Sequence, residues 1–381
     1  MKYLKKVDKI LLIVSLILFI IGLVMVFSSS NVTAYMRYKT SPYYYFIRHS
    51  IFLGLGLVLF LVMINFSGKT VGRISTVLMF ACIAALGALL VIEKSRNNAM
   101  SWFEVGRFTL QPSEFAKVIT IFFLASYYDK NKDGLDDFKT LVWPLIPCII
   151  IAVLILLQPD LGTAIIYTVI VAVIFFAQPM RKITKFRFII LMLCAVLGVF
   201  FLFTNYSDKI LTKTQAERLN IKKPCDRLLT DGSQVCNGYI AMNNGGLWGK
   251  GLGNSTQKYL YLPEPYTDFI FCILVEELGA VFGLFVLILY LILLYRVLKI
   301  GANSVNNRGK TICYGVFIYI LLHISVNLMG IMGLIPMTGV PLPFISYGGS
   351  FTICLVASLT EVQRVNADNM LSKDRELKKR A

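Results

Sequence analysis

Long apolar runs separated by short polar segments are the dominant pattern of this chain. A helix of about 20 apolar residues spans the hydrocarbon core of a bilayer. The pattern therefore predicts an all-α polytopic membrane protein with about ten transmembrane helices, in a single domain over 1–381. The fourth, fifth and last runs are short. The predicted spans are 10–29, 45–65, 74–92, 113–128, 141–157, 161–177, 187–204, 269–295, 311–330 and 351–363.

The distribution of Lys and Arg predicts the orientation. With the N-terminus inside, the inner segments hold 23 basic residues and the short outer loops 37–48 and 94–107 hold six. Short cytoplasmic loops carry the excess of positive charge, so both termini should be cytoplasmic. No small-residue cleavage site follows the first apolar run, and we therefore interpret it as a retained span.

Composition strengthens the membrane assignment and excludes one class of partner. Hydrophobic residues make up 57% of the 381 residues and charged residues 15%, far from the balance of a soluble domain. The formal net charge of +17 fits the topology signal and attraction to anionic lipid headgroups. Because the basic residues are scattered over both faces, we expect no nucleic acid partner.

One loop is too long to be a simple connection. It covers 205–268, between the seventh and eighth spans, and its second half mixes glycines with aromatic residues. This composition favours a loop folded onto the outer membrane face, over a site; the alternative is a partly disordered loop. Cys225 and Cys236 lie in it and would close a disulfide in an oxidising compartment, unless they are two free thiols. The two histidines have no second ligand at metal-binding spacing, so we expect no zinc site.

Acids recur where spans begin on the outer side. "QPSEFAK" places Glu114 in the first turn of the fourth span, and "QPDLGT" places Asp160 at the start of the sixth. Dipole complementarity alone would explain either acid. Lys117 follows Glu114 by three residues, on the same helix face, so the two side chains can pair where either alone would be costly in lipid.

The segment 259–296 keeps three acids in or at the start of a span. Asp268 should lie at the outer membrane surface in the first turn of the helix, with Glu264 just before it. Glu276 and Glu277 should lie about 12 to 13 Å deeper, and at least one should face the bundle interior. Acids at that depth are not explained by a helix dipole, so we expect a substrate-facing cavity.

Four motifs in order along the chain resemble the SEDS family of membrane proteins, to which FtsW and RodA belong. They are "SWFEVGRFTLQPSEFAK", "QPDLGTA", "NSTQKYLYLPEPYTDFIFCILVEELG" and "PMTGVPLPFISYGGS". The resemblance implies a ten-span peptidoglycan glycosyltransferase that polymerises lipid II on the outer face of the bacterial cytoplasmic membrane. It also implies a class B penicillin-binding protein as the transpeptidase partner. The wording "GLGNSTQKYLYLPE" is closer to FtsW, which favours a role with other division proteins at the septum.

The resemblance also implies roles for single residues. Asp268 matches the essential catalytic aspartate of the family, and Trp102, Glu114, Lys117 and Asp160 match its outer-face motifs. Our hypothesis is that Asp268 deprotonates the acceptor hydroxyl while the lipid diphosphate leaves.

The leaving diphosphate needs cationic partners. Candidates are Lys117, Arg218 and Lys258. A divalent cation, Mg²⁺ or Mn²⁺, is the alternative, and no cofactor is firmly implied. The segment 338–350 should shape the lipid groove, unless it is a plain connecting loop.

Three other functions remain open at this point. An elongation or sporulation member of the same family would have the same activity. A lipid II flippase would use the same intramembrane charges, but it should also carry acids and bases toward the inner face. A non-catalytic scaffold for division proteins would not need the intact "TDFIF".

Overall fold

The computed structural model describes residues 3–92, 101–105, 108–181, 183–190, 224–227, 232–259 and 261–380, and most of them are helical. The longer helices follow the apolar runs of the sequence. Six helices among the described residues are long and apolar enough to cross a membrane, and the chain is a multi-pass membrane protein; the count of ten spans stays a prediction. The helices of the bundle are α1 (Lys9–Met36), α2 (Tyr44–Met63), α3 (Gly68–Ile92), α4 (Pro112–Lys130), α5 (Phe138–Val142), α6 (Leu145–Leu157), α7 (Leu161–Phe176), α11 (Ile270–Ala302), α12 (Asn307–Ile331) and α13 (Gly349–Arg380).

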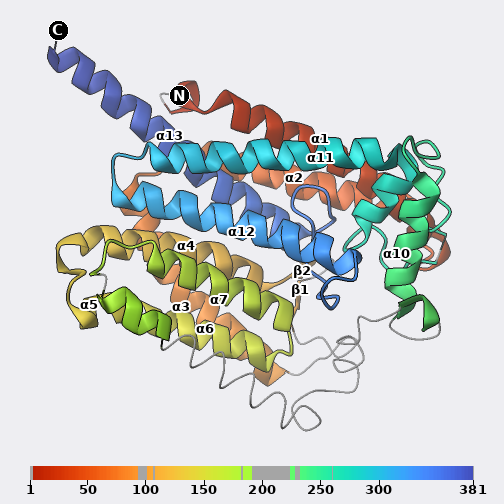
Figure 1. Cartoon of the computed structure of the whole chain (residues 1–381), viewed down its shortest axis with the longest axis horizontal. Coiled ribbons are helices and arrows are strands. Elements are labelled where there is room, and N and C mark those ends of the chain that lie inside the picture. The colour runs from red at the N-terminus through yellow and green to blue at the C-terminus, as the bar shows by residue number, and fades with distance from the viewer. Residues whose placement is uncertain are drawn as a thin grey trace.

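The bundle has two layers with α12 between them (Figure 1). One layer holds α1, α2, α11 and α13, the other holds α3, α4, α6 and α7, and α12 contacts helices of both. Both chain ends lie at one end of the bundle. At the opposite end α10 (Gly232–Gly245) crosses the other helices. The charge count predicts that this second end faces outward.

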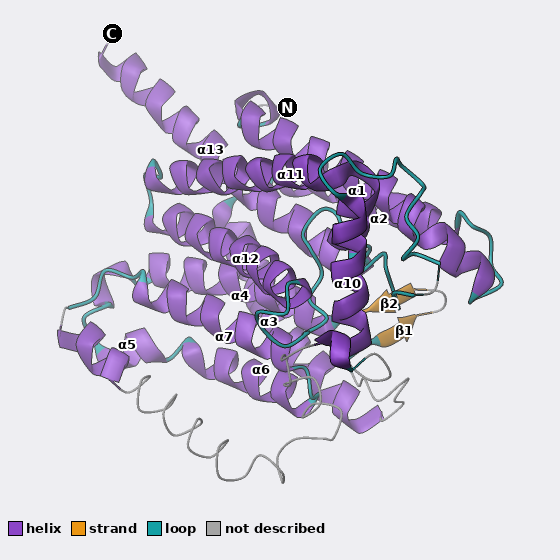
Figure 2. Ribbon diagram, turned by 45° about the vertical axis from the view of Figure 1, so that its right-hand side comes forward, coloured by secondary structure: helices purple, strands orange, loops and turns teal. Residues whose placement is uncertain are grey.

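The final helix and the loop before α4 both depart from the predicted elements. The final helix continues from the short apolar run to Arg380, with a polar second half that projects from the bundle (Figure 1). The all-α prediction missed a two-stranded antiparallel hairpin of β1 (Phe103–Val105) and β2 (Phe108–Leu110), orange in Figure 2. A hairpin this short carries too little periodicity to be read from sequence.

The segment between α12 and α13 is non-helical, and most residues of its second part, 340–346, are buried. Leu342 and Ile345 are fully buried and Phe344 is 2% exposed. Gly22 of α1 makes room for it, because a Cβ at Gly22 would lie 2.1 Å from the Phe344 carbonyl oxygen. Non-helical backbone is tolerated at membrane depth only where protein buries it. Residues 340–346 are thus part of the packed core at the outer end, and a role of the segment in shaping a lipid groove stays a prediction.

Candidate active site

Asp268 lies in the turn that precedes α11, not in its first turn as the sequence predicted. The helix begins at Ile270, and Asp268 is half-buried. The helix thus begins two residues after Asp268, and the acid still lies at the outer end of the bundle. Gly339 passes beside the carboxyl: a Cβ on this glycine would lie 3.6 Å from Asp268 Oδ2. Gly339 has φ +70°, a conformation that favours glycine.

Two polar side chains fix the backbone around Asp268. Asn327 of α12 donates from Nδ2 to the Asp268 carbonyl and to the Val340 carbonyl, both at 2.9 Å. Ser346 Oγ donates to the Thr267 carbonyl at 2.7 Å. The segment 339–347 therefore holds the turn that carries Asp268 from one side.

A buried ion pair lies inside the bundle near this turn. Lys117 Nζ is 2.8 Å from Glu114 Oε1 and 2.9 Å from His323 Nε2, and Lys117 is 1% exposed. The pair has the geometry expected from its three-residue spacing. The contact of His323 with the lysine was not predicted from the sequence. His323 and Asn327 are four residues apart on α12, so their Cα atoms are about 6 Å apart along the helix axis.

The other outer-end motifs meet around the start of α13. Asp160 caps α7 by accepting from the Thr163 backbone N–H at 3.0 Å. Gln111 reaches Asp160 from Nε2 at 3.4 Å, and its backbone N–H donates to Ser350 Oγ at 3.1 Å. Asp160 is thus a helix cap that also contacts Gln111. Trp102 lies just before β1 and is 44% exposed.

Three predicted site residues are not part of this group, which corrects the expectation of one substrate-facing cavity. Glu276 and Glu277 are both fully buried, and Lys258 is 1% exposed. Lys258 Nζ is 2.9 Å from Glu277 Oε1. In this structure Lys258 is thus paired with Glu277, and its role toward a lipid diphosphate stays a prediction. Arg218 lies outside the described residues.

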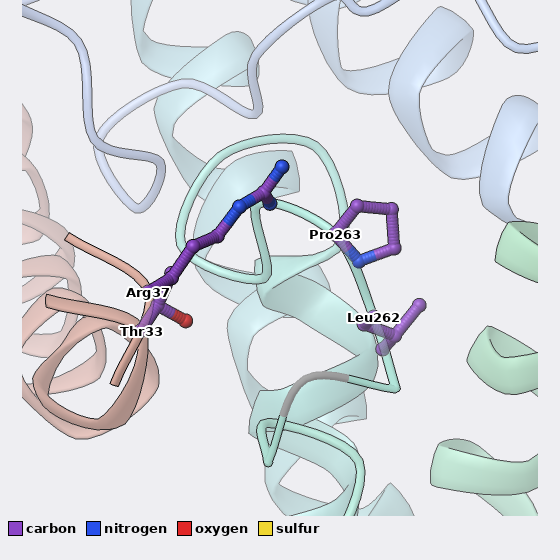
Figure 3. Close-up of a pocket in the computed structure, with 4 residues that line it drawn as sticks. All are labelled: Thr33, Arg37, Leu262 and Pro263. Carbon is purple, nitrogen blue, oxygen red and sulfur yellow. The ribbon is translucent and has the colours of Figure 1, made fainter. Parts of the chain in front are cut away.

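A pocket of about 400 Å³ opens at the outer end of α1, lined by Thr33, Arg37, Leu262 and Pro263 (Figure 3). The Arg37 side chain is half-exposed, and its Nη1 is 3.9 Å from Glu264 Oε1. In Figure 3 the guanidinium extends between the helix end and Pro263. The pocket therefore combines an accessible cation with an apolar wall, next to the segment that leads to Asp268.

Phenols near this pocket stay protonated. Burial, and then the nearby Glu264 carboxylate, raise the pKa of Tyr266 far above its ordinary value. Burial and a 2.8 Å hydrogen bond to Glu264 raise the pKa of Tyr38. These groups can donate hydrogen bonds but are poor general bases at neutral pH. A carboxylate is left as the basic group of this region.

The described part of the long loop contains a helix and a disulfide. Cys225 and Cys236 are joined by a disulfide, with 4.9 Å between their Cα atoms. Cys236 is in α10, a helix that the sequence analysis did not predict. Within the described ranges no group of three or more His, Cys, Asp or Glu side chains is placed to hold a metal ion.

Comparisons with known proteins show the family of the chain. A family model described as "Cell cycle protein" for FtsW, RodA and SpoVE matches residues 8–370. The chain belongs to the FtsW/RodA/SpoVE family.

Two curated relatives come from Bacillus subtilis strain 168. A probable peptidoglycan glycosyltransferase FtsW is 36% identical over 94% of this chain and 90% of its own. Stage V sporulation protein E is 36% identical over 92% and 94%. A solved chain from a peptidoglycan synthase complex that coordinates polymerization and crosslinking superposes with a TM-score of 0.75. It is 25% identical and covers 95% of this chain and 98% of its own.

Sequence reasoning missed several residues of this family member's site. Asn327 and Ser346 hold the Asp268 turn, and Arg37 lines the pocket. A signal existed for Asn327, because an amide inside an apolar span needs a partner. Arg37 was visible only as one basic residue of an outer loop, and nothing in the sequence places it beside Pro263.

Proposed function

We propose that this chain, a peptidoglycan glycosyltransferase by its family, polymerises lipid II into glycan strands at the outer face of the cytoplasmic membrane. The observation that carries the proposal is the placement of Asp268. Its carboxyl is half-buried at the outer end of the bundle, whereas Glu114, Glu276 and Glu277 are sealed in the core. Glu264 also lies at this end, but the Tyr38 hydroxyl donates to its carboxylate, and Asp160 caps α7. Asp268 is the acid of this end that matches the catalytic aspartate of the family motif.

The proposed reaction needs one base and a bound leaving group. Asp268 takes the proton from the 4-hydroxyl of the acceptor GlcNAc. The oxygen attacks the anomeric carbon of the donor MurNAc, the bond to the diphosphate breaks, and undecaprenyl diphosphate leaves with inversion. The Asn327 and Ser346 contacts support this role, because they hold the turn on rigid elements.

Arg37 is the proposed partner of the lipid diphosphate. A guanidinium binds phosphate oxygens through two parallel hydrogen bonds. Its weak 3.9 Å contact with Glu264 leaves it able to turn toward a ligand. Lys117 is paired with Glu114 in the core, and we propose that this pair supports the site from beneath. Trp102 and Asp160 are proposed to border the substrate site beside Asp268.

The proposed partner is a class B penicillin-binding protein, and the proposed setting is the division septum. The superposition on a chain of a peptidoglycan synthase complex supports a transpeptidase partner. The FtsW name of one relative supports the division role, while the equal identity to a sporulation protein keeps the sporulation role as the second candidate.

The test is polymerisation of lipid II by the purified chain in complex with its transpeptidase. We expect glycan strands, resolved as a ladder on a gel. A folded complex that forms no strands from lipid II would overturn the proposal. Movement of lipid II between leaflets without polymerisation would favour a flippase instead.

A further inference from the structure

Helix α11 is interrupted inside its span, and the glycine-rich loop repairs the interruption. Gly279 has φ +88° and ψ 164°. The break frees backbone groups on both sides, and the loop 246–251 pairs with them. Gly251 donates to the Glu277 carbonyl at 2.9 Å, and Ala280 donates to the Gly246 carbonyl at 2.9 Å. Two further bonds, from Lys250 to Glu276 and from Val281 to Leu247, complete the repair at 3.0 and 3.2 Å.

Glycines make this close approach sterically allowed. A Cβ at Gly249 would lie 2.3 Å from the Glu277 carbonyl oxygen, and one at Gly279 would lie 2.3 Å from the Leu247 carbonyl oxygen. Both residues have positive φ as well. The backbone of the loop therefore packs directly against the backbone of α11 at the break.

Glu276 and Glu277, both buried, bind the next part of the loop, 255–258, through hydrogen bonds. Glu276 accepts from Ser255 Oγ and from Thr256 Oγ1, the latter at 2.7 Å. Glu277 accepts from Lys258 Nζ at 2.9 Å and from Ser28 Oγ of α1. We call these contacts of Glu276 and Glu277 the clasp.

The clasp joins the two ends of a chain segment, 258–277, that has Asp268 at its middle. The contact between Lys258 and Glu277 joins residues 19 apart in sequence, with Asp268 ten residues from one and nine from the other. Between them lie the turn that carries Asp268 and the first piece of α11, 270–278. Asn327 and Ser346 hold the turn from one side. The clasp holds the chain segments before and after the turn.

We propose that Glu276, Glu277 and Lys258 are positioning residues that set the placement of Asp268 for glycosyl transfer. They act through the loop and the first piece of α11, and they do not touch the substrate, because all three are sealed from it. The inference rests on the proposed function. An error of 1 Å in the placement of a reacting group can cost about 100-fold in rate.

The test compares single and paired neutral variants in the lipid II assay, in the full complex with the transpeptidase. Glu277→Gln or Lys258→Met alone strands a buried charge, so folded yield should fall. Glu277→Gln with Lys258→Met removes both charges, and folded yield should recover. We expect the paired variant to have kcat lowered about 10- to 100-fold, with KM for lipid II within twofold of the original chain.

Controls and contrary outcomes separate the explanations. The buried pair Arg308–Glu361 lies at the other end of the bundle, and the paired variant Arg308→Met with Glu361→Gln should keep kcat. A clasp pair with normal kcat per folded molecule would show that the clasp only stabilises the fold. A raised KM would show that Lys258 contacts the lipid, and either result overturns the inference. An original chain that polymerises nothing would instead overturn the proposed function, and the inference with it.

Discussion

The carboxylates at the outer half of the molecule differ in their surroundings, and this difference separates their roles. Asp268 is half-buried in a turn, Glu114 is paired with a lysine in the core, and Glu277 is buried in the clasp. A buried carboxylate keeps its charge only where a cation and hydrogen bonds compensate it. The same residue type thus serves as the proposed base at one position and as an anchor at others.

Lys117 tests the role of the buried pair beneath the site. Lys117→Met should strand the Glu114 carboxylate and lower the free energy of unfolding by about 3 to 5 kcal/mol. The thermal stability and folded yield of the detergent-purified protein should fall, and polymerisation with them. The matched control is Lys117→Met with Glu114→Gln, which should recover much of the stability. Unchanged yield and turnover in the single variant would remove the pair from the account.

Substitution of Arg37 tests whether the pocket binds the lipid diphosphate. Arg37→Gln keeps a polar side chain but removes the charge that would bind the diphosphate. We expect KM for lipid II to rise roughly 10-fold, as for loss of a charged hydrogen bond of about 1.5 kcal/mol, with little change in kcat. Lys39→Gln is the matched control: Lys39 is an exposed cation of the same loop and does not line the pocket. Equal KM for Arg37→Gln and Lys39→Gln would place the diphosphate elsewhere.

At the scale of elements, the sequence predicted where helices lie better than how they end. The apolar runs predicted α1, α2, α3 and α12 closely, because burial in lipid demands a continuous stretch of apolar residues. The interruption of α11 was missed, because the apolar pattern continues through Gly279 and only the loop 246–251 reveals the break. Contacts between residues distant in sequence leave no periodic signal.

For the candidate site too, contacts within one helix were predicted from the sequence, and contacts between distant segments were not. Motifs that share a helix, such as Glu114 and Lys117, were paired correctly from spacing alone. Lys258 was assigned to the substrate because its distance from Glu277 in sequence hides their contact. Arg37 and Pro263 belong to segments far apart in the chain, and the pocket exists only where the fold joins them.

The disulfide tests the placement of α10. The structure bonds Cys225 to Cys236, eleven residues apart in sequence. Alkylation of the unfolded, unreduced protein should therefore modify six of its eight cysteines, and all eight after reduction. Mass spectrometry counts the modified thiols. Eight modified cysteines without reductant would show that the bond is absent from the purified protein.

At the scale of the whole molecule, the two ends of the bundle carry different chemistry. Both termini and the ion pairs Asp8–Arg296 and Arg308–Glu361 lie at one end, where they join α1, α11, α12 and α13. The other end holds the Asp268 turn, the pocket, the hairpin and α10. The basic inner segments of the sequence predict that the first end is cytoplasmic, which would place the candidate site on the side where glycan is made.

The central claim is that Asp268 is the base of glycosyl transfer. Asp268→Asn keeps the size of the side chain and removes its basicity. The decisive measurement is the rate of glycan formation from lipid II by the purified variant in complex with its transpeptidase, beside Glu276→Gln.

We expect Asp268→Asn to polymerise at least roughly 100-fold more slowly than the original chain, with folded yield and partner binding retained. Glu276→Gln should lose stability along with some of its rate. An Asp268→Asn variant that polymerises near the original rate, beside a Glu276→Gln variant that is well folded and inactive, would contradict the account and move the reactive centre deeper into the membrane.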